Sequence, residues 1–318
     1  MQPTNSRNAL VIGYGSIGSR HARILESHCK SVSLVTKQDA GKFRTYDSIV
    51  QAFSRDHFDY VVIANNTSDH FDAYRNLVAV GYTGALLIEK PVFDKRPEAP
   101  ISSPFSLCGV GYNLRFLPVL QRLKELLGND TIVTVNVYVG QYLPSWRPKR
   151  ANGTDSYSAK KKLGGGVLRD LSHEIDYIQW IFGEWTNLTA LGGKISDVTI
   201  DSDDAYSILL KTKRCSNVVV HMNYLNRSAK RFMIVNSNKG TWIADLITGQ
   251  LEIQRFTQDE QIIEKHGVNS DFTYSLMHKH LLAGETSICC TLNEAMQTLA
   301  AIEACEVASS TKTWISAV

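Results

Sequence analysis

The sequence lacks the features that mark membrane, secreted and zinc-binding proteins. No stretch approaches the roughly 20 apolar residues that cross a bilayer, and the first apolar run, 9–12, is too short for a signal-peptide core. The six cysteines form no C-x-x-C pair, and Cys289 and Cys290 are adjacent, which is poor ligand geometry. We therefore expect free thiols, no metal, no membrane partner and a cytoplasmic location.

The chain also has little excess charge of either sign. Its 34 basic and 31 acidic residues leave a formal net charge of +3, too little to indicate a nucleic-acid partner. Hydrophobic residues make up 43% and charged residues 20%, which is typical of a folded protein. A length of 318 residues favours two domains.

The first third of the sequence alternates strand-like and helix-like segments. Strands are predicted at 8–12, 31–36, 59–64, 85–88 and 107–110, and helices at 17–27 and 69–80. Such β-α-β alternation predicts a parallel sheet covered on both faces.

The pattern changes after Tyr112. Helices are predicted at 116–127, 167–182, 275–282 and 292–307, and strands at 131–139, 188–195, 205–212, 218–225, 232–235, 241–245 and 250–256. Short strands in succession favour a large open sheet that is mostly antiparallel. We therefore predict two domains, 1–112 and 113–318, the second of α+β class.

A glycine-rich turn joins the first predicted strand to the first predicted helix. Gly13-Tyr14-Gly15-Ser16-Ile17-Gly18 matches G-x-G-x-x-G. The first glycine makes the tight turn, the second lets the backbone approach a pyrophosphate, and the third lets helix and strand pack closely. The pyrophosphate would meet the positive end of the helix. Residues 1–112 are therefore predicted to be a doubly wound Rossmann domain that binds a dinucleotide.

The end of the second predicted strand bears on the choice of cofactor. An acidic residue there would bind the ribose of NAD, whereas basic and hydroxyl side chains suit the 2′-phosphate of NADP. Thr36 and Lys37 follow the strand, and the nearest acid, Asp39, lies slightly further on and can still serve NAD. The pattern favours NADP slightly over NAD.

Several motifs together resemble the Gfo/Idh/MocA oxidoreductases. After the glycine motif come Ala64-Asn65-Asn66-Thr67-Ser68-Asp69-His70, then Glu89-Lys90-Pro91, Gly164-Gly165-Gly166 and His173-Glu174-Ile175-Asp176. The resemblance spans nearly the whole chain. It implies a Rossmann domain, a second domain whose open sheet often forms homodimers or homotetramers, and oxidation or reduction of sugars with NAD or NADP. Segments 141–148 and 157–159 look like a branch from bacterial surface-polysaccharide gene clusters.

The resemblance also implies which residues meet the nicotinamide. In relatives the lysine of Glu-Lys-Pro and the histidine of His-x-x-Asp lie there, which here are Lys90 and His173. Many relatives have an aspartate four residues before the histidine. In this chain Asp170 lies only three before it, which leaves the role of Asp170 open.

The chemistry of these side chains fits hydride transfer. Removing a hydride from a carbinol carbon requires loss of the hydroxyl proton, which histidine can accept near neutral pH. Lys90 can stabilise the negative charge that grows on the oxygen. Helical periodicity places His173 and Asp176 opposite the apolar stripe of 167–182. Asp176 or Asp170 would orient the imidazole, although an ion pair on the helix surface, with Arg169 for example, explains Asp176 equally well.

The remaining candidates follow from strand ends and from a basic loop. The expected cofactor contacts are Gly13, Tyr14, Gly15, Ser16, Ile17, Gly18, Thr36, Lys37, Asn65, Asn66, Thr67, His70, Glu89, Lys90 and Asn113. The expected substrate contacts are Lys90, Tyr142, Trp146, Arg147, Tyr157, Arg169 and His173. Helix capping at 66–68, a turn at Asn113 and a solvated basic loop at 144–163 are the competing explanations.

These inferences define one leading hypothesis and three others. The leading one is an oxidoreductase acting on a secondary alcohol or ketone of a sugar derivative. The basic loop favours a nucleotide sugar, for example a UDP-N-acetylhexosamine oxidised at carbon 3 in polysaccharide biosynthesis. The others are an oxidoreductase of a sialic-acid-like acid or its precursor, an NAD-dependent glycoside hydrolase, and a non-catalytic cofactor sensor.

Overall fold

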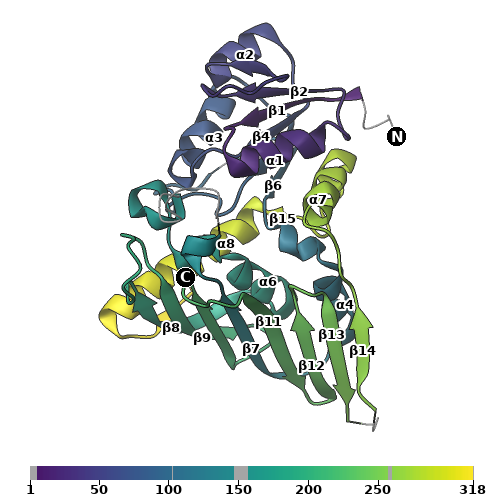
Figure 1. Cartoon of the computed structure of the whole chain (residues 1–318), viewed down its shortest axis with the longest axis vertical. Helices are drawn as coiled ribbons and strands as arrows, with labels where there is room; N and C mark the ends of the chain where they lie inside the picture. The colour runs from purple at the N-terminus through teal and green to yellow at the C-terminus, as the bar shows by residue number, and fades with distance from the viewer. Residues whose placement is uncertain (1–5, 102, 147–156, 257–259, 318) are drawn as a thin grey trace. The chain divides into compact units, whose positions relative to one another are not determined.

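The computed structural model describes residues 6–101, 103–146, 157–256 and 260–317, and the chain divides into two compact units (Figure 1). Unit 1 comprises Met1–Phe116 and Ser270–Met296, and unit 2 comprises Leu117–Asn269 and Gln297–Val318. The chain thus returns to unit 1 after leaving it. The sequence predicted two continuous domains that meet after Tyr112, which placed 270–296 in the second domain. The contacts in the structure place 270–296 in unit 1 instead, so the predicted and observed divisions differ there.

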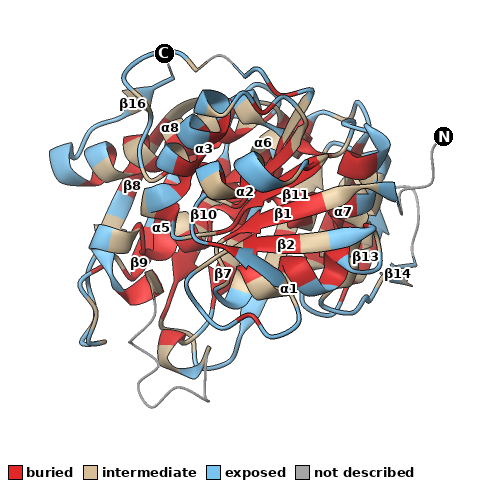
Figure 2. Cartoon of the chain, turned by 90° about the horizontal axis from the view of Figure 1, so that it is seen from above, coloured by how far each residue is buried: buried red, intermediate tan, exposed pale blue. Residues whose placement is uncertain are grey.

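Unit 1 is built on a seven-stranded sheet in the order β15-β6-β5-β4-β1-β2-β3. Its strands are β1 (Asn8–Ile12), β2 (Ser31–Val35), β3 (Arg44–Tyr46), β4 (Tyr60–Ile63), β5 (Ala85–Ile88), β6 (Leu107–Val110) and β15 (Cys290–Thr291). All neighbouring pairs are parallel except β15 with β6. Its helices are α1 (Ser16–Leu25), α2 (Ile49–Arg55), α3 (His70–Ala79) and α7 (Phe272–Ala283). The central strands are buried along most of their length (Figure 2), which confirms the predicted sheet with both faces covered.

The strand order places the switch point of this sheet between β1 and β4. From β1 the chain builds outward to β2 and β3, and from β4 it builds the other way to β5 and β6. In open α/β sheets, ligands bind at the carboxyl ends of the strands on either side of such a reversal. The segments that begin at Gly13 and Asn65 follow these two strands.

Unit 2 contains a nine-stranded sheet in the order β14-β13-β12-β11-β7-β10-β9-β8-β16. Its strands are β7 (Ile132–Gly140), β8 (Trp185–Gly193), β9 (Ala205–Thr212), β10 (Val218–Asn223), β11 (Lys230–Ser237), β12 (Gly240–Asp245), β13 (Gln250–Arg255), β14 (Ile262–Lys265) and β16 (Ile315–Ser316). Only β7 and β10 pair in parallel. The predicted large, mostly antiparallel sheet is therefore confirmed.

The helices of this part of the chain are α4 (Pro118–Leu127), α5 (Val167–Asp170), α6 (His173–Phe182) and α8 (Leu292–Thr311), whose first five residues belong to unit 1. The prediction of one continuous helix over 167–182 is wrong, because the chain breaks the helix at residues 171–172. His173, Asp176 and Tyr177 are buried, as is the apolar stripe, whereas Gln179 and Trp180 of the same helix are partly exposed. Across the described residues, no helix is long and apolar enough to cross a membrane.

Candidate active site

The glycine motif in unit 1 has the space that a pyrophosphate needs. Gly13 has φ +97°, and a Cβ there would lie 2.6 Å from the backbone nitrogen of Asn65. A Cβ on Gly18 would lie 2.2 Å from the carbonyl oxygen of Gly13. At Gly15, by contrast, a Cβ would meet nothing within 4 Å, and Gly15 makes no side-chain cap for α1. The first and third glycines thus hold strand and helix together, and the second leaves open space beside the helix N-terminus.

These differences predict separable effects of two alanine substitutions. Gly15→Ala should leave the thermal unfolding midpoint near that of the native protein but weaken dinucleotide binding, because its methyl group enters the open space. Gly18→Ala should destabilise unit 1 by about 1–3 kcal/mol, because the methyl group collides with backbone. Calorimetry and cofactor titration measure the two effects. Equal loss of stability in both variants would contradict this assignment.

The end of β2 lies next to this turn. Gly13 N–H donates to the carbonyl of Val35 at 3.0 Å, which fixes the first glycine against the strand end. Thr36 and Lys37 follow directly, Thr36 partly buried and Lys37 exposed. Asp39, the competing acid, accepts the N–H of Gly41 at 2.9 Å and so closes a turn of its own. The strand end therefore presents a hydroxyl and an ammonium group before any carboxylate.

The segment after β4 carries four of the predicted cofactor residues. Asn65 lies against Gly13, and its Oδ1 is buried without a hydrogen-bond partner among the described residues. Asn66 is exposed and precedes the 3₁₀ helix η2 (Thr67–Asp69) without capping it through its side chain. Thr67 is buried. An unpaired buried acceptor beside open space at Gly15 is what a dinucleotide site would show, so these residues fit that cofactor.

His70 has a second contact that the sequence did not reveal. Its Nδ1 lies 3.1 Å from the carbonyl oxygen of Pro91 and 3.2 Å from that of Val92, so it donates to the backbone just after Lys90. Burial lowers the pKa of His70, more than Glu89 and these carbonyls raise it. The imidazole therefore helps to fix the segment that carries Lys90, and its predicted contact with cofactor stays a prediction.

Glu89 and Lys90 follow β5 directly. Glu89 is 5% exposed, whereas Lys90 is partly exposed. The carboxylate of Glu89 accepts the backbone N–H of Lys90 at 3.1 Å and the Nε2 of His21 at 2.8 Å. Lys90 thus lies at the carboxyl end of a parallel strand, where the sequence placed it.

Asn113 begins the 3₁₀ helix η3 (Asn113–Phe116) and is buried. Its Nδ2 donates to Oγ1 of Thr273 at 2.7 Å, which ties η3 to α7 within unit 1. The amide is therefore committed to a structural contact, and its predicted role at the nicotinamide stays a prediction.

In unit 2, His173 opens α6 and is 8% exposed. The short helix α5 that precedes it begins directly after the three glycines, 164–166. Gly166 has φ +129°, and a Cβ there would come within 2.1 Å of Oδ1 of Asp203. The other oxygen of Asp203 accepts the N–H of Leu168 at 3.0 Å and so caps α5. Burial raises the pKa of Asp203 more than this bond lowers it.

Asp170 has a definite partner on the sheet. Its Oδ2 accepts the hydroxyl of Tyr224 at 2.6 Å, and Tyr224 in turn meets the ring of Trp146 edge-on with centroids 5.2 Å apart. The Nε1 of Trp146 is buried without a partner among the described residues. Asp170 therefore orients an aromatic pair, Tyr224 and Trp146. Asp176 is 1% exposed, so the alternative of a surface ion pair for it is wrong.

The structure adds a buried charge that the sequence did not identify. Glu174, next to His173, is fully buried and accepts Nε of Arg231 on β11 at 2.7 Å and Nη2 at 3.0 Å. The hydroxyl of Tyr177 donates to the same carboxylate at 3.2 Å. These contacts anchor the first turn of α6 to the sheet and so fix the position of His173. The available signal was a charged residue directly after His173 in a helical stretch rich in apolar residues.

The other predicted substrate residues are only partly brought together. Arg169 forms an ion pair with Glu306 on α8. The guanidinium of Arg227 lies 3.3 Å from the ring centroid of Tyr142. Tyr157 lies beside Gly165, whose Cβ would meet its carbonyl oxygen. Arg147 lies outside the described residues.

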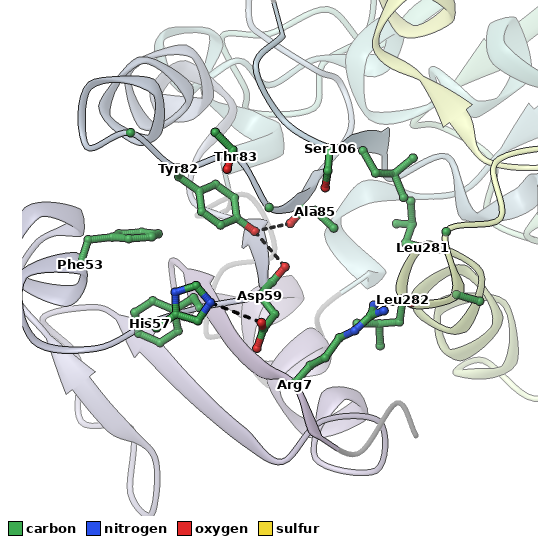
Figure 3. A pocket seen from close by; sticks show the side chains of 16 residues that line it. Arg7, Phe53, His57, Asp59, Tyr82, Thr83, Ala85, Ser106, Leu281 and Leu282 are labelled. Carbon is green, nitrogen blue, oxygen red and sulfur yellow. Dashed lines mark hydrogen bonds and ion pairs between the residues drawn. The ribbon is translucent and has the colours of Figure 1, made fainter. Parts of the chain in front are cut away.

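A pocket of about 600 Å³ in unit 1 lies at the opposite edge of the sheet (Figure 3). Its walls include Arg7, Asp59, Ala85 and Leu107, which lie at or just before the amino ends of their strands. Ligand sites of this fold lie at the carboxyl ends, so the pocket is distinct from the candidate site. Among the described residues, no cluster of three or more His, Cys, Asp and Glu side chains could hold a metal ion.

Family models identify the class of protein to which this geometry belongs. Residues 7–99 match the oxidoreductase family with an NAD-binding Rossmann fold, and residues 120–243 match the Gfo/Idh/MocA C-terminal domain. The two matches together cover more than half of the chain. The chain therefore belongs to the Gfo/Idh/MocA oxidoreductase family, and its N-terminal part is an NAD-binding Rossmann fold.

Individual relatives are distant. An uncharacterised oxidoreductase of Synechocystis sp. is 22% identical over 203 residues, 57% of this chain and 52% of that protein, so the match spans about half of the relative. Among solved structures, GenD2 from gentamicin A biosynthesis in complex with NAD is 18% identical, with TM-score 0.81 over 100% of this chain and 98% of that one.

Two further structures have sugar-related names. UDP-N-acetylglucosamine 3-dehydrogenase GnnA from Acidithiobacillus ferrooxidans is 17% identical, with TM-score 0.76 over 96% of this chain and 98% of that one. Levoglucosan dehydrogenase in complex with NADH and L-sorbose is 13% identical, with TM-score 0.83 over 98% of both chains. At these identities the likeness supports the fold.

Proposed function

We propose that the protein transfers a hydride between a nicotinamide cofactor and a secondary alcohol or ketone of a nucleotide sugar. The observation that carries this proposal is that the open glycine turn at Gly15 follows β1 and that Lys90 follows β5, two strands away in the same parallel sheet, in a chain of this oxidoreductase family. A turn alone would bind a dinucleotide, but a lysine at that edge also supplies charge for a reacting oxygen.

We propose the following division of labour. In the oxidative direction His173 accepts the hydroxyl proton of the substrate, and the ammonium group of Lys90 stabilises the oxygen as its negative charge grows. When bound, the nicotinamide supplies the hydride acceptor, or the donor in the reductive direction. Asp176 acts with His173 from the same helical turn, and Asp170 holds Tyr224 and Trp146 in place.

A nucleotide sugar is the substrate class that the exposed groups of unit 2 favour. Lys160, Lys161 and Lys162 are exposed just before the glycines, and Trp146 is partly exposed, with a buried Nε1 that has no partner among the described residues. Cationic and aromatic side chains of this kind bind phosphates and stack on bases or sugars. The 3-dehydrogenase action on UDP-N-acetylglucosamine that one structural neighbour's name states makes UDP-N-acetylhexosamines the first candidates. The same chemistry would serve the biosynthesis of surface polysaccharides.

For the cofactor we propose that NADP is preferred to NAD. Thr36 and Lys37 follow β2 without an intervening acid, and Asp39 is engaged with the N–H of Gly41. A 2′-phosphate would find a cation there, whereas the ribose hydroxyls of NAD would lack the usual carboxylate. Tighter binding of NAD than of NADP at equal ionic strength would exclude this preference.

We also propose that the protein is a homodimer or homotetramer joined through the open face of the nine-stranded sheet. Tyr138 stacks between His221 and Phe232 on that face, and Leu191 and Leu209 are 64% and 48% exposed. An apolar face of this kind is typical of a subunit interface. A monomer mass by light scattering at micromolar concentration would exclude it.

The test of the proposed function is nicotinamide absorbance with NAD and NADP in parallel, against UDP-sugars, CMP-sugars and free sugars. Turnover of one UDP-sugar, faster with NADP, is the expected result. Turnover of a CMP-linked or free acidic sugar would favour the sialic-acid alternative. If no sugar in the panel changes the nicotinamide absorbance although the cofactor binds tightly, the result would contradict the proposal and favour a hydrolase or a sensor.

A further inference from the structure

A chain of four buried side chains runs through the interior of unit 1 and ends at the Glu-Lys-Pro segment. The hydroxyl of Tyr60 lies 2.9 Å from Nδ1 of His278, and Nε2 of His278 lies 2.8 Å from Nδ1 of His21. Nε2 of His21 lies 2.8 Å from Oε1 of Glu89. The side chains come from β4, α7, α1 and the end of β5, and none is more than 5% exposed.

The protonation states give this chain a direction. Burial raises the pKa of Tyr60 well above its usual value, so the hydroxyl keeps its proton and donates to His278. Burial holds the pKa of His278 well below its usual value, so this ring is neutral near pH 7. Its single N–H is then Nε2–H, which donates to His21, and His21 donates to Glu89. Every donor therefore points toward the carboxylate, and each bond polarises the next.

Glu89 connects this chain to the backbone of Lys90. Burial raises the pKa of Glu89, but the hydrogen bond from His21 and the charge of Lys90 outweigh it and leave the pKa lowered. The other carboxylate oxygen accepts the N–H of Lys90 at 3.1 Å. Gly111 leaves room for this arrangement, because a Cβ there would lie 2.8 Å from Oε1 of Glu89. One oxygen of the Glu89 carboxylate thus bonds to the ring of His21, and the other oxygen fixes the backbone N–H of Lys90.

We propose that the Tyr60–His278–His21–Glu89 chain positions Lys90 for hydride transfer, with His21 as the positioning residue that acts through Glu89. The proposal rests on the proposed function of Lys90. If the chain were purely structural, loss of the His21 contact to His278 and loss of the His21 contact to Glu89 would each destabilise unit 1, and neither loss would affect kcat more than the other. A positioning network must instead depend on the contact between His21 and Glu89.

Two substitutions at His21 separate these roles. His21→Gln places an amide N–H near the position of Nε2, so it keeps the contact to Glu89 and gives up that to His278. His21→Asn places its amide near Nδ1, so it keeps the contact to His278 and is too short to reach Glu89. We expect His21→Gln to retain kcat within about 3-fold and His21→Asn to lower kcat by about 10-fold or more, as loss of an orienting partner typically does. The Kd for NADP should change by less than about 3-fold in both. Equal kcat in the two variants would overturn the proposal.

A second readout needs no substrate. In the cofactor-bound protein labelled with ¹⁵N-lysine, the Lys90 amide is identified by its disappearance in Lys90→Arg. Because this N–H donates to a carboxylate, we expect its proton resonance to move upfield in His21→Asn and to stay near its native position in His21→Gln. If His21→Asn does not fold, Glu89→Gln should give the same upfield shift. An unmoved Lys90 resonance would overturn the positioning role, whereas absence of turnover in the native protein would overturn only the proposed function.

Discussion

Replacing His173 by alanine is expected to lower kcat by about 100- to 10,000-fold, the usual contribution of a positioned general base. The hydroxyl proton must leave as the hydride departs, and without an acceptor it has to pass to water. His173 lies at the first position of α6, which Glu174 anchors to β11 through Arg231. Truncation of the imidazole should therefore leave α6 in place. Stopped-flow absorbance with the sugar found to turn over measures the loss directly.

The control for this variant is His57→Ala. The side chain of His57 is 84% exposed and lies near the amino ends of the unit 1 strands, whereas the glycine turn and Lys90 lie at their carboxyl ends. Its removal should therefore change neither kcat nor cofactor binding. The Kd for the cofactor should also stay within a few-fold in His173→Ala, because the glycine turn that holds the dinucleotide belongs to unit 1. Native turnover in His173→Ala would remove this residue as the base, and the assignment would pass to another group.

The sequence predicted the elements that periodicity and glycine turns define. The buried strands β1, β4 and β5 and the glycine motif lie where they were expected, because each is specified by neighbouring residues. Strands β15 and β16, with two residues each, were not predicted. They form only by pairing with strands that are distant in sequence, β15 with β6 and β16 with β8, and local sequence patterns do not predict such pairing. The return of α7 to unit 1 escaped prediction for the same reason.

The candidate site shows the same division between local and distant information. The sequence located Lys90 at a strand end, and His173 and Asp176 opposite the apolar stripe, but a single stripe does not predict that both of these side chains are buried. Arg231 is 57 residues from Glu174, and His278 is 257 residues from His21. Neither pairing leaves a trace in local spacing. Asp170 and His173 belong to different helices, because the helix breaks between them.

Replacing Arg231 by methionine is expected to destabilise unit 2 by about 3–5 kcal/mol, the usual cost of leaving one partner of a buried ion pair alone. The carboxylate of Glu174 is fully buried, and the side chain of Arg231 is 22% exposed, so solvent cannot replace the lost charge. Tyr177 would remain as a partner with one O–H, which cannot neutralise the carboxylate. Methionine keeps most of the volume of the arginine stem, so the loss reports on charge and not on packing. Denaturant unfolding measures it.

The double variant Glu174→Gln with Arg231→Met tests the cause. If the cost comes from the uncompensated carboxylate, removing that charge should recover a large part of the lost stability, because a neutral amide can share the hydroxyl of Tyr177. The control Lys213→Met removes one cation of a surface pair with Glu184, whose side chains are 63% and 52% exposed, and should change stability by less than about 1 kcal/mol. A double variant as unstable as Arg231→Met alone would show that the guanidinium acts through packing. Because Glu174 directly follows His173 in the first turn of α6, recovery of stability in the double variant should bring recovery of kcat with it.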